Sequence, residues 1–388
     1  MNLASKHMNI ILVLPRVSYR GGERIFYTLA LGLTRLGHRV KIITASVDEK
    51  NAFPFDKKIL LVSPPKLINM FLQSNVSLFL FSFPVLLVLL ALSAKDTDII
   101  DSESFFSLWA SIIIGKLFGK KVVWTIFAFE RKPLGGSLLN NLFAHTLRKI
   151  DRFFARQADG YACIAPRIAR VVKRTYGIEG VRLTIPAIDL ARFKKAKRGK
   201  FTKKFAGERG KLLLLPATLH PKKNQELAIY SLKRILKVFP GSKLILLGEG
   251  KDEGRLRRLS KSLGLNRNVV FAGVAKGGSM GEYYKISDVV LVTSKVENEG
   301  LSMTAFEALA CWKMPIVSKG AGAAEIIEGK RIGLVANPTP ADYSRMVIEY
   351  LGHPGKYKTI LSRGNRFVRG ELTLEKFARD TEELFFLI

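Results

Sequence analysis

The stretch from residue 294 to residue 325 restricts the fold of this chain more than any other part of the sequence. It reads SKVENEGLSMTAFEALACWKMPIVSKGAGAAE and follows the apolar run Val289–Val292. The pattern predicts a strand, an acidic loop, a helix and then a second strand over Pro315–Ser318. Strands that alternate with helices are typical of a parallel sheet covered by helices. We therefore expect an α/β domain in this half of the chain.

The junction between the acidic loop and the helix has the chemistry of an anion site. The first backbone N–H groups of a helix have no internal partners and carry partial positive charge, so they favour a phosphate. Gly300, Leu301 and Ser302 lie at this junction. Glu299 stands just before the helix and Glu307 about two turns into it, so their carboxylates flank the anion. This arrangement predicts a ligand with a sugar, a diphosphate and a ribose in a row.

The stretch resembles the nucleotide-binding half of retaining glycosyltransferases of family 4, the glycogen-synthase-like group 1, which have the GT-B fold. The resemblance rests on the E-x7-E element Glu299–Glu307, the strand Pro315–Ser318 and the glycine-rich segment 320–325. An E-x7-E spacing alone also occurs on surface helices whose acids are simply solvated. The resemblance implies an α/β protein of two Rossmann-like, doubly wound domains that face a cleft, with the donor held mainly by the second domain.

The resemblance covers nearly all of the 388 residues and implies their division into domains. Residues 1–193 are expected to form a Rossmann-like acceptor domain, and the basic segment 194–211 a linker. Residues 212–372 are expected to form the nucleotide-sugar domain. In the resembling fold the terminal helix, residues 373–388, crosses back to the first domain.

The first domain begins with a predicted strand over residues 9–14, then Gly21 and Gly22, then a helix from Arg24 to Leu36. Adjacent glycines let the backbone approach a phosphate closely, although such a pair is also common in ordinary turns. The loop lacks the G-x-G-x-x-G pattern, which argues against a dinucleotide enzyme. In the resembling family this loop touches the donor phosphate or the acceptor. Gly21 and Gly22 are therefore candidate donor-binding residues.

The segment 67–94 carries no charge, and its most apolar part is residues 76–94. Length alone makes this part a candidate membrane span. Three interpretations stay open: a helix pair lying in the membrane interface, an ordinary core helix, or a true span. A span would put strands of one sheet on opposite sides of the bilayer. Pro84 is also expected to interrupt the helix midway.

Residues 136–157 form a second candidate for membrane contact. Their apolar side chains recur at helical spacing, and cationic side chains border this stripe: Arg148, Lys149, Arg152 and Arg156. A basic amphipathic helix suits an anionic membrane surface. It suits equally a helix that packs on the core and turns a basic side to water.

In the second domain, one loop and two glycines are expected to complete the donor site. Lys223 and Asn224 end the loop before a predicted helix and match the second half of a family pattern of Arg, four residues, Lys, then Gly or Asn. Gly248 and Gly250 follow a predicted strand and match the family's loop near the nucleotide. All four are candidate donor-binding residues.

Two positions depart from the family pattern. Thr218 stands where the family has Arg, and Lys cannot reproduce the bidentate phosphate contact of an Arg. Phe127 stands where the family often has a histidine, with Glu130 as the nearest ionisable residue. Three cationic or titratable side chains are candidates to compensate for the missing Arg: Lys222, His220 and Arg20.

The charge balance favours anionic partners. The chain has 63 Lys and Arg against 32 Asp and Glu, a formal net charge of +31. Because no helix-turn-helix, zinc-finger or RNA-binding signature is present, we expect no nucleic acid partner. Cys163 and Cys311 lie in apolar runs, which predicts free thiols in a reducing compartment. No CxxC or histidine cluster predicts a zinc site.

The resemblance implies transfer of a sugar from a nucleotide sugar with retention of configuration. Glu299 and Lys223 are the expected catalytic residues, the first on the sugar hydroxyls and the second on the leaving diphosphate, with Glu307 on the ribose. We expect no cofactor and no metal, because no acidic pair is placed as a metal-binding motif. Asp98 and Asp101 are interpreted as strand-end residues.

The apolar segment and the basic surface predict a lipid-linked or other membrane-associated glycan as acceptor. The Lys-Lys-Asn loop looks most like that of mannosyltransferases of lipid-linked oligosaccharide assembly. The apolar run at the start of the chain is too short for a signal peptide. We therefore expect a cytoplasmic protein bound peripherally to an anionic membrane surface. The alternatives are a weak or inactive scaffold of the same fold at the membrane, and a glycosyltransferase with a soluble acceptor.

Overall fold

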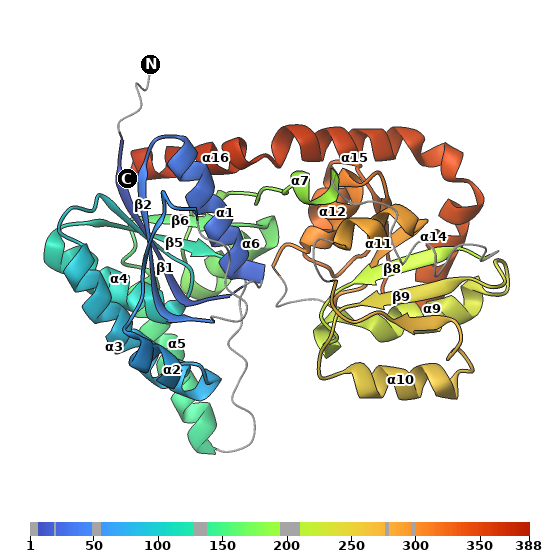
Figure 1. The fold of residues 1–388 in the computed structure, drawn as a ribbon, viewed down its shortest axis with the longest axis horizontal. Helices are drawn as coiled ribbons and strands as arrows, with labels where there is room; N and C mark the ends of the chain where they lie inside the picture. Colours follow the sequence, from blue (N-terminus) through green and yellow to red (C-terminus); the bar gives the residue numbers. More distant parts are fainter. Residues whose placement is uncertain are drawn as a thin grey trace. The chain divides into compact units, whose positions relative to one another are not determined.

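We describe the fold from a computed structural model. The structure describes residues 7–18, 21–48, 56–127, 138–194, 210–275, 279–295 and 300–388. The chain divides into two compact units, one of Met1–Ala187 with Leu374–Ile388 and one of Ile188–Thr373. Each unit is a sheet with helices on its faces (Figure 1). The expected linker, residues 194–211, lies largely outside the described residues.

The first unit is built on a parallel sheet of the order β3-β2-β1-β4-β5-β6-β7. The chain moves outward from β1 to β3, crosses to β4 and then moves the other way, which makes the sheet doubly wound. This part of the fold prediction is confirmed. The strands are β1 (Asn9–Val17), β2 (Arg39–Val47), β3 (Leu60–Val62), β4 (Ile99–Ser102), β5 (Lys121–Ile126), β6 (Gly160–Cys163) and β7 (Arg182–Leu183).

The helices of the first unit form two layers. Right-handed crossovers that run in opposite directions place α1 on one face of the sheet and α3, α4 and α5 on the other. The packing agrees, because α1 contacts α16, whereas α3 contacts β2 and α4, and α4 contacts α5. The helices are α1 (Gly21–Arg35), α2 (Lys66–Phe71), α3 (Asn75–Ser93), α4 (Phe105–Phe118), α5 (Leu138–Ala155), α6 (Pro166–Tyr176) and α16 (Leu374–Leu387).

Two boundaries at the start of the chain differ from the prediction. The strand β1 continues through Pro15 to Val17, since the neighbouring residues Leu14 and Arg16 both pair with β2. The helix α1 begins at Gly21, so the two glycines form its first turn and not a loop before it. The first N–H groups of any helix have no acceptor inside the helix. The two glycines can therefore form the first turn, and the helix need not begin after them.

The apolar segment 67–94 folds as two helices, α2 and α3. Pro84 lies inside α3 and does not end it, contrary to the prediction. Pro84 is exposed, and the contacts of α3 with β2 and α4 stabilise the helix despite the missing backbone hydrogen bond. Among the residues that the structure describes, no helix has the length and apolar character needed to cross a membrane.

The predicted apolar stripe of residues 136–157 holds only in part. Phe154 packs against Trp109 of α4, with ring centroids 5.7 Å apart. Phe153 belongs to the predicted apolar stripe but is exposed, whereas the acidic residue Asp151 is fully buried. The helical spacing is correct, but the neighbouring α4 decides which side of α5 is covered. The side chains of residues 138–144 lie outside the described part.

The second unit holds a parallel sheet of the order β10-β9-β8-β11-β12-β13, which is again doubly wound. Its strands are β8 (Leu212–Pro216), β9 (Lys243–Leu247), β10 (Val269–Phe271), β11 (Val289–Val292), β12 (Met314–Ser318) and β13 (Leu334–Ala336). Its helices are α7 (Ala191–Lys194), η1 (Pro221–Lys223), α9 (Gln225–Ile235), α10 (Glu253–Ser262), α11 (Met280–Ile286), α12 (Met303–Ala310), α13 (Ala324–Gly329), α14 (Pro340–Gly352), η2 (Pro354–Tyr357) and α15 (Lys358–Glu371).

The terminal helix α16 belongs to the first unit, although the chain reaches it from the second. It packs on α1, where a Cβ at Gly32 would lie 2.7 Å from the side chain of Ala378. Glu382 accepts a 2.8 Å hydrogen bond from the buried ring of His38, which follows α1. This close packing fixes the position of α16 on the first unit.

Candidate functional site

The candidate site lies at the carboxyl ends of β8 and β11 in the second unit. These strands are neighbours in the sheet, with Leu213 opposite Val289. The chain leaves β8 toward β9 on one side and later returns to β11 on the other. Such a reversal opens a crevice at the carboxyl edge of a doubly wound sheet, where ligands bind. A small pocket is found at this point, lined in part by Pro216, Val292 and Ser302.

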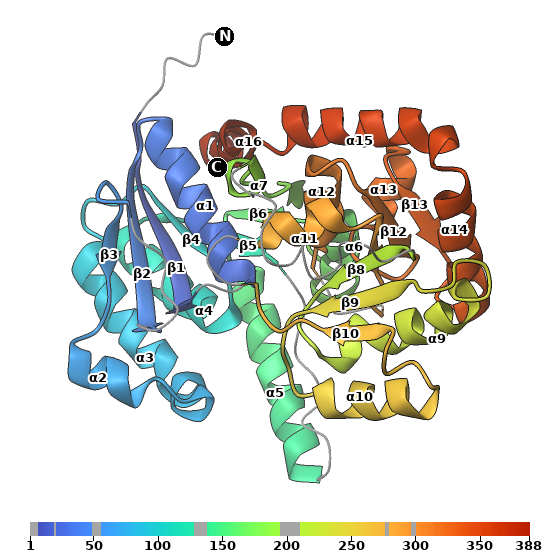
Figure 2. The same ribbon diagram turned by 45° about the vertical axis from the view of Figure 1, so that its right-hand side comes forward.

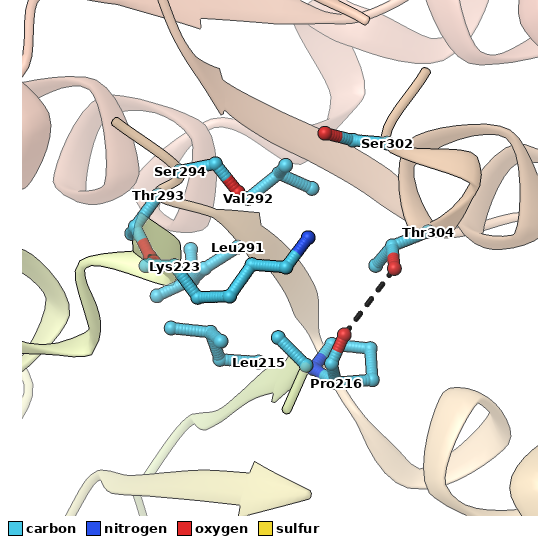
Figure 3. A pocket seen from close by; sticks show the side chains of 10 residues that line it. Leu215, Pro216, Lys223, Leu291, Val292, Thr293, Ser294, Ser302 and Thr304 are labelled. Atoms are coloured by element: carbon cyan, nitrogen blue, oxygen red, sulfur yellow. Dashed lines mark hydrogen bonds between the residues drawn. The ribbon is translucent and has the colours of Figure 1, made fainter. Parts of the chain in front are cut away.

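Lys223 extends into this pocket from the 3-10 helix η1 (Figure 3). Its backbone carbonyl accepts a 2.7 Å hydrogen bond from Thr293 Oγ1, which ties η1 to the end of β11. A second tie runs from the N–H of Lys295 to the carbonyl of Lys222, 2.8 Å. The lysine therefore stands on a backbone that is held at two points.

Asn224 makes the tight turn from η1 into α9. It has φ 51° and ψ 44°, the left-handed conformation that Asn accepts more readily than most residues. The next residue, Gln225, is fully buried, and its Nε2 donates a 2.8 Å hydrogen bond to the carbonyl of Thr218. These contacts close the loop from residue 217 to residue 224 around Lys223. The side chain of Thr218 is exposed.

The helix α12 points its N-terminus at the same pocket. The helix begins at Met303 with Ser302 as its cap, one to two residues later than predicted. The Oγ of Ser302 is buried and has no hydrogen-bond partner among the residues that the structure describes. The Oγ1 of Thr304 donates to the carbonyl of Pro216 at 3.2 Å (Figure 3). The unsatisfied hydroxyl of Ser302 beside a helix N-terminus and a lysine suits a bound anion.

Glu307 lies on α12 one turn from its start, closer than the two turns predicted. Its Oε2 accepts a 2.8 Å hydrogen bond from the hydroxyl of Tyr284 on α11. Burial raises the pKa of the Tyr284 hydroxyl well above its usual value, and the Glu307 carboxylate raises it further. Tyr284 therefore remains a hydrogen-bond donor that holds one oxygen of Glu307 in place.

Gly248 and Gly250 are needed where two loops meet at the end of β9. A Cβ at Gly248 would lie 2.2 Å from the carbonyl oxygen of Ala217, and one at Gly250 would lie 2.2 Å from that of Leu219. Gly248 also has φ +147°, which side chains disfavour. The glycines thus allow this loop to pack against the loop that carries Lys223.

The other predicted donor residues, Gly21 and Gly22, belong to the first unit. A Cβ at Gly22 would lie 2.7 Å from Glu103 Oε1 and 3.2 Å from Phe127, so a larger residue would require the Glu103 side chain to move. Phe127 is buried and packs edge-to-face on Phe26, 5.5 Å between ring centroids. It therefore takes a core position in this chain.

Asp101 is the last residue but one of β4, and Asp98 immediately precedes that strand, which agrees with their interpretation as strand-end residues. Asp101 is also part of the core. It lies within β4, is fully buried, and its Oδ2 accepts a 2.9 Å hydrogen bond from Thr125. Burial raises its pKa to about 8, against the lowering effect of that hydrogen bond. The pKa of the nearby Glu103 is also raised to about 8, by burial and then by the Glu23 and Asp101 carboxylates.

Three residues that the sequence singled out, Glu299, Arg20 and Glu130, lie outside the described residues. Gly300 and Leu301 lie next to Ser302, and Leu301 is buried. Among the described residues no group of three His, Cys, Asp or Glu side chains could hold a metal ion.

Three residues of this region were not predicted from the sequence: Tyr284, Thr293 and Thr304. Tyr284 contacts Glu307 across 23 positions, and Thr293 bonds to Lys223 across 70. No local pattern marks a partner at that distance. Thr304 lies inside the E-x7-E element, where a hydroxyl in the first turn of the helix was the available signal.

Two family models match consecutive parts of this chain. The model described as Glycosyltransferase Family 4 matches residues 19–192, and the one described as Glycosyl transferases group 1 matches residues 197–366. The chain belongs to these glycosyltransferases. Among solved structures, this glycosyltransferase resembles Anabaena HepE in complex with UDP, with a TM-score of 0.74 and 16% identity over 98% of this chain and 100% of that one. The likeness supports the GT-B fold.

The curated relatives match only part of this chain. An uncharacterized glycosyltransferase of Methanocaldococcus jannaschii is 28% identical over 176 residues, 45% of this chain and 44% of that protein. The GDP-mannose-dependent monoacylated alpha-(1-6)-phosphatidylinositol monomannoside mannosyltransferase of Corynebacterium glutamicum is 24% identical over 69% of this chain and 68% of that protein. The match to the first relative thus spans less than half of its length.

Proposed function

We propose that this glycosyltransferase moves a sugar from a nucleotide sugar to a lipid-linked or other membrane-associated glycan, with retention of configuration. The observation that carries the proposal is the pocket at the β8–β11 crevice. There the Lys223 side chain faces the unsatisfied hydroxyl of Ser302 at the N-terminus of α12. A cation, a helix N-terminus and an unpaired hydroxyl together form a site for a phosphate group.

In the proposed reaction the bond between the anomeric carbon and the diphosphate breaks, and the acceptor hydroxyl forms the new bond on the same face of the sugar. The hydroxyl proton goes to the departing diphosphate. Lys223, Ser302 and the first N–H groups of α12 stabilise the negative charge that builds on the leaving group. Glu307 would accept hydrogen bonds from the ribose, and Glu299 from the sugar.

The proposal includes no metal and no cofactor. The support for this part is the positive charge that the chain itself brings to the leaving group. Where Lys223 and a helix N-terminus neutralise a diphosphate, the role that a divalent cation plays in other transferases is already filled. A chelator would then leave turnover unchanged, and a loss of turnover on chelation would contradict this part of the proposal.

The acceptor part of the proposal rests on two observations. The mannosyltransferase of Corynebacterium glutamicum, which matches 69% of this chain, is named for a phosphatidylinositol mannoside. The chain itself has a formal net charge of +31 and an uncharged apolar segment, which suit an anionic membrane surface. We therefore propose peripheral binding at the cytoplasmic face of a membrane.

A donor panel tests the proposal. Purified protein is mixed with GDP-, UDP- and ADP-sugars, and the unfolding temperature and the release of nucleoside diphosphate are measured. We expect one nucleotide series to raise the unfolding temperature, and release to rise when a polyprenyl diphosphate glycan is added. Stabilisation without transfer to lipid or soluble acceptors would indicate an inactive scaffold. No stabilisation by any nucleotide would contradict the donor site.

A further inference from the structure

The helix α2 turns an uncharged polar side chain toward the protein and apolar side chains outward, which is the opposite of an ordinary surface helix. Its polar residue Asn69 faces the protein and is only 6% exposed, whereas Leu67 is 79% exposed. Met70 and Phe71, one turn on from Leu67, are exposed as well. Residues three and four apart share one side of a helix, so these three apolar side chains form a single outward face.

Hydrogen bonds to the end of β2 fix this orientation. Asn69 Oδ1 accepts from the N–H of Val47 at 2.7 Å, and Asn69 Nδ2 donates to the Val47 carbonyl at 3.2 Å. Gln73 Nε2 donates to the same carbonyl at 3.0 Å. An amide side chain thus takes the inward position that an apolar residue normally fills. Rotating α2 to bury its apolar face would break these bonds, so the exposure is built into the fold.

The helix α3 continues the same surface. Phe71 of α2 contacts Phe81 of α3, with ring centroids 5.2 Å apart, and both views show α2 beside the start of α3 (Figure 2). Along α3, Phe81, Val88 and Leu92 are exposed at helical spacing. The opposite side of α3 packs on β2 and α4. The helix is therefore apolar on its inner and on its outer side.

The α2–α3 pair carries no carboxylate of its own, and the first one after it is the exposed Asp96. The chain has no carboxylate between Lys66 and Lys95, and both lysines are exposed, one at each end of the α2–α3 pair. On the adjacent α4, the exposed Leu117 follows the exposed Lys116. Lysine stems can lie along apolar surface while their ammonium groups reach phosphates. Anionic lipid headgroups above acyl chains complement this arrangement.

We propose that the surface formed by Leu67, Met70, Phe71, Phe81, Val88 and Leu92 is where this glycosyltransferase binds an anionic bilayer. The two helices lie in the headgroup region with their outer side chains among the acyl chains. This inference rests on the proposed function, because a lipid-linked acceptor must be reached at a membrane. It adds which part of the chain makes the contact.

Sedimentation with vesicles tests the surface without donor or acceptor. Wild-type protein is expected to bind vesicles of phosphatidylcholine and phosphatidylglycerol, and to bind pure phosphatidylcholine more weakly. The double variants Leu67→Gln/Phe71→Gln and Val88→Gln/Leu92→Gln should each lower the partition coefficient about a hundredfold, about tenfold for each side chain withdrawn from the lipid.

Leu387→Gln is the matched control. Leu387 is 74% exposed, close to the 79% of Leu67, but it lies on α16, which packs with α1 on the opposite face of the sheet. The control should bind vesicles like the wild type. Because all of these residues are exposed, every variant should also keep its unfolding temperature and its stabilisation by nucleotide.

Three results would overturn the proposal. The first is that the wild type stays in the supernatant with anionic vesicles. The second is that both double variants bind vesicles like the wild type. The third is that light scattering shows a wild-type dimer that the double variants convert to monomers, which would assign the surface to a second copy of the chain. Vesicle binding without any nucleotide stabilisation would instead contradict the proposed function and leave the surface standing.

Discussion

The hydroxyl of Tyr284 donates a 2.8 Å hydrogen bond to the carboxylate of Glu307. Tyr284 is fully buried on α11, and its ring meets Phe193 of α7 edge-to-face, with centroids 5.6 Å apart. One oxygen of Glu307 is thus held by a rigid donor, and the other can face a ligand. We infer that Tyr284 is a positioning residue for the carboxylate proposed to bind ribose.

Tyr284→Phe should weaken nucleotide binding because the Glu307 side chain gains freedom that binding must then remove. A hydrogen bond to a carboxylate contributes roughly 1.5–3 kcal/mol, so the loss of affinity should not exceed about a hundredfold. Calorimetric titration with nucleoside diphosphate measures it. Tyr161→Phe is the control, since its hydroxyl bonds to the carbonyl of Ala155 at 2.9 Å in the other unit. Equal effects of the two variants on affinity would contradict a positioning role.

Glu307→Ala should weaken nucleotide-sugar binding about ten- to a hundredfold, because a hydrogen bond to a charged group contributes roughly 1.5–3 kcal/mol. The titration is repeated with the double variant Tyr284→Phe/Glu307→Ala. If Tyr284 acts only through Glu307, it should have no further effect on affinity once Glu307 is gone. Additive losses would show that the tyrosine contacts the ligand by another route, and unchanged affinity in folded Glu307→Ala would refute the ribose role.

Lys223→Ala should reduce turnover on the order of a hundred- to a thousandfold. Removing one oriented group that stabilises developing charge costs roughly 2.7–4 kcal/mol in comparable sites. Steady-state kinetics of nucleoside diphosphate release measures the loss. The control is Lys233→Ala, the same change at an exposed lysine of α9 that lies outside the pocket lining. If both variants lose turnover equally, general charge and not the placement of Lys223 is responsible.

Thr218→Arg tests the departure from the family pattern. Thr218 is exposed on the loop before η1, so an arginine there can extend toward the pocket without entering the core. We expect turnover to stay equal or to rise by up to about tenfold, since an Arg–phosphate contact adds a charge-assisted hydrogen bond. Thr218→Lys serves as the control for charge alone. Abolished turnover with Arg would show that another cation already occupies this space.

The stability of the chain should depend on pH through Asp101. Its pKa is about 8 in the folded chain and about 4 when unfolded. Between these values the folded chain keeps a proton that the unfolded chain releases, so stability is fully present below pH 4 and falls as pH rises to about 8. Chemical denaturation across this range should show the fall in wild type relative to Asp101→Asn. Parallel curves would mean that Asp101 is ionised in the fold.

The alternation of apolar runs and glycine-bearing loops determined the doubly wound α/β fold. Each run, such as Val289–Val292, is long enough to fill a buried strand and too short for a helix, and the order of elements leaves few topologies. Local chemistry at the start of one helix marked Ser302 and Glu307, which are close in sequence. Lys223 lies far from them along the chain and was marked by the resemblance of its own loop to the family pattern.

Only the tertiary structure decided which faces the helices turn outward. The sequence of α3 is apolar on every side, so its pattern could not separate core from membrane surface. The contacts with β2 and α4 bury Leu86 and Leu90 and leave Leu92 at 80% exposure. In α2 the bonds of Asn69 to β2 reverse the expected orientation. Likewise, the partner of Glu307 is 23 positions away. Long-range packing chooses among orientations that hydrophobicity alone leaves equal.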